Sequence, residues 1–134
     1  MNLMKSKQKL AFSILASALI GAAIGGVVFW KVRGRIADYE SGAKSVLICM
    51  RTHDLVEPGV SEALDYQIAF FTRHGLERLK STPKFVPLLC ETRLPEDIVD
   101  DPQKVAAAAN RYTKYSPLSE AEAGGALEIA RKRQ

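Results

Sequence analysis

A long apolar stretch near the start dominates the pattern of hydrophobic and polar positions. Residues 10–30, LAFSILASALIGAAIGGVVFW, contain no charged side chain. As a helix this stretch would extend roughly 31 Å, close to the ~30 Å hydrocarbon core of a bilayer. The pattern predicts a transmembrane anchor over residues 10–30, a basic tail over residues 1–9 and a small, mostly helical soluble domain over residues 31–134.

Basic side chains lie on both sides of the predicted anchor, and an aromatic pair closes it. Such residues favour the headgroup region of a bilayer. The flanking residues are Lys5, Lys7, Lys9, Trp30, Lys31, Arg33 and Arg35. The charge is nearly balanced, but a short charged tail is more easily left in the cytoplasm than translocated. This favours an orientation with the C-terminal domain on the outer, extracytoplasmic side.

A cleaved signal peptide is the alternative interpretation of the same stretch. It has a lysine-bearing start and small-residue cleavage sites at Ala16-Ser17-Ala18 and Gly21-Ala22-Ala23. Cleavage after Ala18 would leave a strongly apolar mature N-terminus, so cleavage after Ala23 is the better version. The length of the apolar run favours an anchor.

Small residues recur every fourth position within the predicted anchor, at Ser13, Ser17, Gly21 and Gly25. On a helix they form a groove that allows a second helix to approach closely. The functional interpretation is helix pairing in the membrane. The simpler one is that Gly, Ala and Ser are common in transmembrane segments.

After the anchor the apolar spacing changes to that of amphipathic helices. Apolar residues recur every three or four positions between Ile36 and Met50, which predicts a helix that is either continuous with the anchor or broken near Gly34. A turn is expected at Glu57-Pro58-Gly59. A second helix with a wide apolar face should start near Val60 and end at His74-Gly75, and its aromatic residues should pack in the core.

The sequence after the second predicted helix indicates shorter elements of secondary structure. Prolines interrupt the apolar run at 85–90, which favours a kinked short helix or an extended segment. Asp101 as N-cap and Pro102 at the first position predict a helix reaching about Tyr115. Ser119 and Glu122 have capping-box spacing and predict a last helix with a frayed end. The expected fold class is all-α, with one transmembrane helix and about four helices in the domain.

The charge distribution argues against nucleic-acid binding. The net charge of the whole chain is +4. Residues 36–134, however, carry 13 basic against 15 acidic side chains, a net charge of −2. No basic face remains in the domain for a phosphate backbone.

The two cysteines, Cys49 and Cys90, are forty-one positions apart and form a candidate disulfide if the domain faces an oxidising compartment. In the cytoplasm they would be buried thiols. With His53 and His74 they make a nominal metal set, but the spacing lacks the paired knuckles of structural zinc sites. No metal or other cofactor is expected.

Catalytic motifs are weak. Residues 59–63 approach the nucleophile elbow around Ser61 but lack its last glycine, so a helix start is the stronger interpretation. The acidic residues at 96–101 lack the spacing of a calcium loop and suit helix N-termini. There is no Walker or dinucleotide motif. We therefore expect no enzyme and no small-molecule substrate.

The expected function is that of a single-pass membrane-anchored interaction or assembly protein. Its partners would be the lipid bilayer and either a second protein or another copy of the chain, paired through the anchor. The alternative is an envelope or secreted binding protein of inhibitor or immunity type, with a signal peptide or tether. A membrane-bound hydrolase using His53, His74, Ser61 or Cys90 ranks third.

Overall fold

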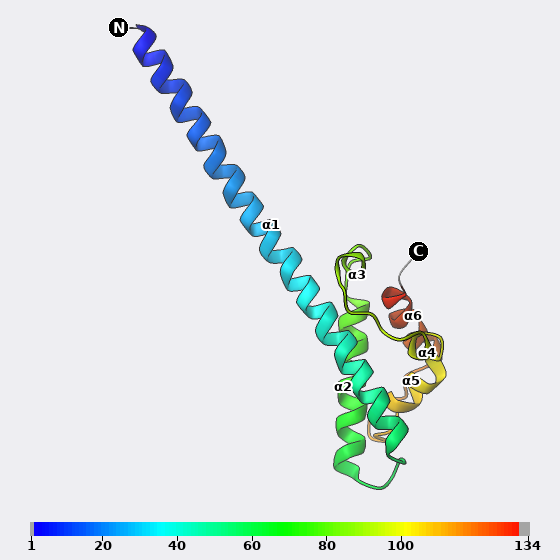
Figure 1. The fold of residues 1–134 in the computed structure, drawn as a ribbon. Helices are drawn as coiled ribbons and strands as arrows, with labels where there is room; N and C mark the ends of the chain where they lie inside the picture. Colours follow the sequence, from blue (N-terminus) through cyan, green and yellow to red (C-terminus); the bar gives the residue numbers. More distant parts are fainter. Residues whose placement is uncertain (1, 132–134) are drawn as a thin grey trace. The chain divides into compact units, whose positions relative to one another are not determined.

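The computed structural model describes residues 2–131 (Figure 1). Over this range the chain is all-helical, with no strand, as predicted. The helices are α1 (Asn2–Leu55), α2 (Glu62–Lys80), α3 (Val86–Leu89), α4 (Glu96–Val99), α5 (Pro102–Ala109) and α6 (Glu120–Ala130). The chain divides into two compact units, one reaching to Gly34 and one starting at Arg35, and each is described by itself.

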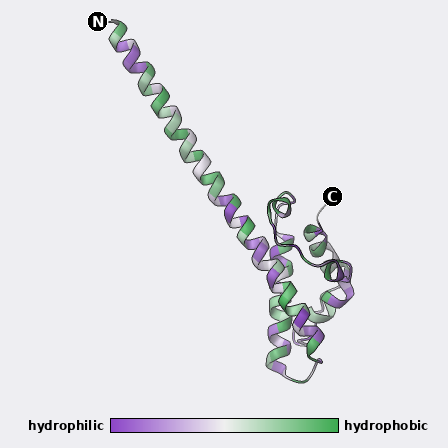
Figure 2. Ribbon diagram, in the orientation of Figure 1, coloured by the Kyte–Doolittle hydropathy of each residue, from purple (hydrophilic) through white to green (hydrophobic). Residues whose placement is uncertain are grey.

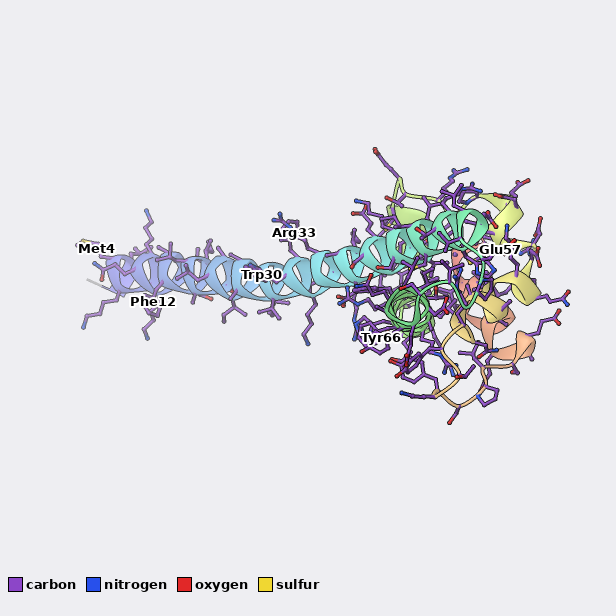
Figure 3. All side chains as sticks on the ribbon, turned by 90° about the horizontal axis from the view of Figure 1, so that it is seen from below. Met4, Phe12, Trp30, Arg33, Glu57 and Tyr66 are labelled. Carbon is purple, nitrogen blue, oxygen red and sulfur yellow. The ribbon has the colours of Figure 1, made fainter. Side chains whose placement is uncertain are left out.

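The first unit is the N-terminal part of α1. Its apolar side chains are exposed, among them Phe12 and Trp30 (Figure 3). Hydrophobic residues predominate along this stretch (Figure 2). Of the helices in the described range, α1 is the one long and apolar enough to cross a membrane. It is continuous through Gly34, so the break considered there is absent.

The second unit is organised by the packing of α1 against α2. Their crossing point is a pair of glycines, Gly42 and Gly75, both buried. A Cβ added at Gly75 would lie 2.9 Å from the carbonyl oxygen of Gly42 and 2.8 Å from a methyl carbon of Val46. The predicted end of the second helix at His74-Gly75 is therefore wrong. Gly75 serves helix packing, and α2 continues to Lys80.

The core of this unit lies between α1, α2, α5 and α6. The largest fully buried side chains include Tyr39 and Met50 of α1 and Leu79 of α2. Val105 of α5 and Leu127 of α6 close the core from the other side. Burial of each of the aliphatic side chains and of Met50 contributes roughly 1.5–3 kcal/mol.

The helix starts follow the sequence closely. Ser61 caps α2 by accepting a hydrogen bond from the Leu64 NH, so the helix begins after Val60, which is exposed. Asp101 caps α5 through the Lys104 NH, with Pro102 at the first position. Ser119 and Glu122 form the complete capping box of α6. The turn at 57–59 is present, with Gly59 at φ +89°.

The length of α5 differs from the prediction. It ends at Ala109, with Asn110 as C-cap, and residues 110–119 are irregular. The expected continuation to Tyr115 is therefore wrong. Asn110 ends the helix because its side-chain oxygen accepts from the Leu118 NH and its amide donates to the Leu118 carbonyl.

Candidate interaction surface

The outward face of α2 carries a row of aromatic rings. Tyr66, Phe70 and His74 follow one another at four-residue spacing, and Phe71 lies beside them. Tyr66 is 41% exposed, Phe70 38% and Phe71 47%. The opposite face of α2 holds the buried residues, with Ile68 and Leu76 among them. The expectation that these aromatic residues pack in the core is wrong, since they form a surface.

The rings are ordered by contacts with one another. Tyr66 and Phe70 stack with centroids 5.8 Å apart, and Phe70 stacks on His74 at 5.7 Å with an interplanar angle of 8°. Phe71 meets Phe70 edge to face at 5.3 Å. Aromatic pairs at these separations contribute about 0.5–1.5 kcal/mol beyond their buried area. The row is thus held in a fixed arrangement while its outer side stays open to solvent.

Two tyrosines from the irregular segment after α5 extend this surface. Tyr112 meets Tyr66 edge to face at 5.1 Å, and Tyr115 lies 5.0 Å from Tyr112. Lys114 lies over the ring of Tyr112. Burial and the neighbouring Tyr66 raise the pKa of Tyr115. We call the set Tyr66, Phe70, Phe71, His74, Tyr112 and Tyr115 the aromatic surface.

Arg73 fixes the segment that carries the two tyrosines. Its Nε donates to the Ala109 carbonyl at 2.8 Å, and its Nη2 donates to Asn110 Oδ1 at 2.9 Å and to the Ser116 carbonyl at 2.7 Å. The guanidinium also lies 5.0 Å from the ring centroid of Tyr115. Hydrogen bonds to a charged donor contribute about 1.5–3 kcal/mol each. The aromatic surface therefore rests on a pre-ordered segment.

A buried ion pair lies beneath one end of this surface. Arg111 pairs with Asp65 at 2.8 Å, and their side chains are 1% and 9% exposed. Arg111 also donates to the carbonyls of Val56 and Glu57, and Asp65 accepts from the Gly59 NH at 2.9 Å. The pair joins the loop before α2 to the segment after α5.

Arg111 shifts the pKa values of both Asp65 and His53. Burial alone raises the pKa of Asp65, but the hydrogen bonds from Arg111 and the Gly59 NH outweigh it and leave the pKa below its ordinary value. Burial, followed by the charge of Arg111, lowers the pKa of His53. Because arginine can only donate, the His53 Nδ1, 3.2 Å from Arg111 Nη1, must be the acceptor of a neutral imidazole. Asp65 and Arg111 also line part of an open pocket of about 410 Å³ beside Tyr112.

Cys49 and Cys90 are both buried, and the described structure contains no disulfide between them. Cys90 Sγ donates to the Val86 carbonyl at 3.3 Å. Burial raises the pKa of the Cys49 thiol, against a smaller opposite effect of Thr72. Disulfide formation in an oxidising compartment stays a prediction.

The other chemical candidates are dispersed. Within residues 2–131 no three metal-ligating side chains come together. His74 belongs to the aromatic surface, His53 faces Arg111, and Ser61 caps α2, so the hydrolase set has no common site. Three of the acidic residues at 96–101 are used in ion pairs or a cap: Asp97 with Arg51, Asp100 with Arg131, and Asp101 at the start of α5.

The predicted membrane residues all lie on α1. A Cβ added at Gly21 or Gly25 would meet nothing within 4 Å, so the small-residue stripe with Ser13 and Ser17 is open. The flanking basic residues and Trp30 are exposed. Helix pairing through this stripe stays a prediction.

The aromatic surface was missed by sequence reasoning although its signal was present. Apolar and aromatic residues occur on nearly all sides of the second helix, and a helix of this kind has more than one covered face. One face, from Ile68 to Leu79, is covered by the core. The second, from Tyr66 to His74, is covered only at its Tyr66 end, by Tyr112 and Tyr115, among the described residues. Neither a family model, nor a curated protein, nor a solved structure matches this chain.

Proposed function

We propose that this chain is a single-pass membrane-anchored interaction protein. The N-terminal part of α1 spans the bilayer, and the helical domain from Arg35 onward docks on a partner protein through the aromatic surface. The observation that carries the proposal is the aromatic surface itself, because exposed, ordered rings beside an arginine are the composition of interface hot spots. Three phenylalanine and tyrosine side chains on α2 alone are each more than a third exposed.

The anchor is supported by the exposure of its apolar residues. A core helix of a soluble protein buries its apolar side chains, whereas the most apolar window of α1 is not buried at all. Lipid is the environment that suits such a surface on every face of the helix. The charges of the two flanks are nearly balanced, and the short charged tail, which is more easily left in the cytoplasm, favours the orientation with the domain on the extracytoplasmic side.

Pairing within the membrane would use the stripe of small residues. Ser13, Ser17, Gly21 and Gly25 allow a second helix, from the partner or from another copy, to come within backbone distance. Once the anchors have paired, the domain and its docking site on the partner are held close together, which raises their effective concentration for each other. The same holds for the anchors once the domain has docked. The expected product is a stable membrane complex built from two individually modest contacts.

Site-specific photo-crosslinking of the full chain in its native membrane tests the docking surface. A photoreactive phenylalanine at Phe71 should yield a discrete adduct with a protein, and the adduct should be lost when Tyr66 is changed to serine. The control position is Ile48 on α1, which is 65% exposed and thus at least as accessible as Phe71. Equal adduct patterns at Phe71 and Ile48 would contradict docking through the aromatic surface.

A matched pair of anchor variants tests pairing. Gly21→Leu fills the small-residue stripe, whereas Ala23→Leu adds the same kind of bulk on the opposite side of the helix. Gly21→Leu should reduce the amount of the complex recovered in a mild detergent, and Ala23→Leu should not.

Removal of residues 1–34 tests the alternative function. If the partner captures the truncated domain as efficiently as the full chain, the alternative of a secreted or tethered binding protein is favoured.

A further inference from the structure

A pocket of about 410 Å³ lies between the loop before α2, the first turn of α2 and the segment after α5. Four of its lining residues carry the argument: Glu62, Asp65, Arg111 and Tyr112. The volume is within the range of ligand pockets, about 300–1,000 Å³. Tyr112 also belongs to the aromatic surface, so the pocket opens beside the proposed docking site. We call it the α2 pocket.

Arg111, the basic residue that lines the α2 pocket, has no hydrogen-bond donor to spare. A guanidinium carries five N–H groups. Nε and Nη2 bind Asp65 Oδ1 at 2.9 Å and 2.8 Å, and Nη2 also donates to the Glu57 carbonyl. Nη1 donates to the Val56 carbonyl and faces the acceptor Nδ1 of His53. These contacts account for all five donors, so an anionic ligand would find no free N–H group on Arg111.

The two carboxylates of the α2 pocket, by contrast, have acceptor positions to spare. An ionised carboxylate offers about four lone-pair positions. Asp65 uses three of them, two for Arg111 and one for the Gly59 NH. Glu62 is 74% exposed, and its contact with Lys114, at 3.4 Å, is a loose one. The balance of donors and acceptors therefore selects a ligand that donates hydrogen bonds.

Lys114 marks the place of a positive charge at the mouth of the α2 pocket. Its Nζ lies 5.8 Å from the centroid of the Tyr112 ring and 3.4 Å from Glu62 Oε1. The face of an aromatic ring attracts a cation. The hydrogen bond to Glu62, followed by the charge of Tyr112, raises the pKa of Lys114. Lys114 is 72% exposed, so a cation from another molecule can replace it without breaking a buried contact.

An arginine side chain fits the α2 pocket better than a lysine side chain does. A guanidinium is planar, binds a carboxylate through two parallel hydrogen bonds and stacks on an aromatic ring. Glu62 supplies the carboxylate and Tyr112 supplies the ring. Arginine is also among the residues that concentrate binding energy at protein interfaces.

From these contacts we propose that the α2 pocket receives an arginine side chain of the docking partner. The guanidinium displaces Lys114, donates to Glu62 and to the remaining acceptor position of Asp65, and stacks on Tyr112. The inference rests on the proposed function and names the chemistry of the partner. That partner is a protein that presents an arginine next to the apolar residues that cover Phe70 and Phe71.

Neutral substitutions test the proposal on the full chain in its native membrane, with the photoreactive phenylalanine at Phe71 as the reporter of docking. Glu62→Gln should reduce the yield of the adduct about tenfold or more, because a hydrogen bond between two charged groups is lost. Glu77→Gln is the matched control and should leave the yield unchanged, since Glu77 is exposed on the same helix and lies outside the pocket. Lys114→Gln should raise the yield, because the competing ammonium is gone.

The opposite signs of these two effects separate binding from stability. Glu62 also offsets the partial positive charge at the N-terminus of α2, so its replacement affects the helix as well. Glu62→Gln and Lys114→Gln, however, break the same exposed ion pair. Loss of that pair would change the adduct in the same direction in both variants. Only competition between Lys114 and an incoming cation changes it in opposite directions.

Competition with a small guanidinium compound completes the test. N-acetyl-arginine amide at millimolar concentration should reduce the Phe71 adduct, and its neutral isostere, N-acetyl-citrulline amide, should not. Equal effects of the two compounds, or an adduct unchanged by Glu62→Gln and Lys114→Gln, would overturn the arginine proposal and retain docking through the aromatic surface. Absence of a Phe71 adduct in the otherwise unchanged chain would overturn the docking itself, and the arginine proposal with it.

Discussion

Gly42 on α1 and Gly75 on α2 meet backbone to backbone, with no room for a side chain on either. A Cβ at Gly42 would lie 2.9 Å from the Cβ of Arg78 and 3.0 Å from the carbonyl oxygen of Gly75. These distances are shorter than an ordinary van der Waals contact, and the carbonyl cannot move without the helix. The two longest helices of the domain can therefore pack this closely only with glycine at both positions.

Replacement of Gly75 by alanine should destabilise the domain. Alanine gains about 1 kcal/mol of helix propensity, but overpacking against a fixed backbone costs about 1–3 kcal/mol. We expect a net loss, measured as a lower denaturant midpoint of the full chain in detergent micelles. Gly125→Ala is the control, because an added Cβ there meets nothing within 4 Å and the variant should be more stable. An unchanged or raised midpoint for Gly75→Ala would contradict the close packing.

Removal of Arg111 should be among the most damaging single changes. Arg111→Ala leaves the buried carboxylate of Asp65 without its counter-ion, which costs about 3–5 kcal/mol. The double variant Asp65→Asn with Arg111→Met should recover part of the loss, because no uncompensated charge remains. Thermal unfolding followed by circular dichroism compares the two. A double variant less stable than Arg111→Ala would show that the charge is not the main cost.

Stability should fall on mild acidification because of His53. Its pKa is lowered in the folded chain from the ordinary value of 6.5, so the unfolded chain binds a proton more readily. The contribution of neutral His53 to the free energy of unfolding is therefore complete above about pH 7. It is lost as the pH falls through the pKa that His53 has in the unfolded chain toward its lower pKa in the folded chain. His53→Asn keeps a hydrogen-bond acceptor for Arg111. We expect it to flatten the pH dependence of stability between about pH 7 and pH 5, measured as the denaturant midpoint.

Maleimide labelling can test the orientation of the domain, but the native cysteines are poor reporters. Cys49 and Cys90 are 7% and 4% exposed, so both should react slowly in the folded chain on either side of a membrane. Val60→Cys places an accessible thiol in the loop before α2, where Val60 is 73% exposed. We expect an impermeant maleimide to label this variant in intact cells. Labelling only after lysis would place the domain in the cytoplasm.

The parts of the fold that are specified locally could be predicted from the sequence. Ser119 with Glu122, and Asp101 with Pro102, satisfy backbone NH groups within one helical turn, so their spacing alone identifies two helix starts. The apolar stretch ending at Trp30 is equally local, because length and composition define it. Its environment, a bilayer, remains a prediction.

The parts that depend on contacts distant in sequence could not be predicted. A glycine after His74 is typical of a helix end, and only the approach of Gly42 gives Gly75 a different role. Similarly, α5 ends early because Asn110 binds the backbone of Leu118 and because Arg73, 36 positions before Ala109, binds its last carbonyl. The aromatic surface was misassigned because a face of Tyr66 and Phe70 looks the same in sequence whether it is covered by the core or by a partner.

The Asp65–Arg111 pair also bears on how the domain is made. The two residues are separated by 46 positions, so Asp65 is synthesised well before its counter-ion. At about 5–20 residues per second, this interval is roughly 2–9 seconds. If the N-terminal stretch inserts into a membrane first, the nascent domain waits beside the translocation machinery with an unpaired carboxylate and an unfinished core. Final folding is then expected to be a late, essentially post-translational event.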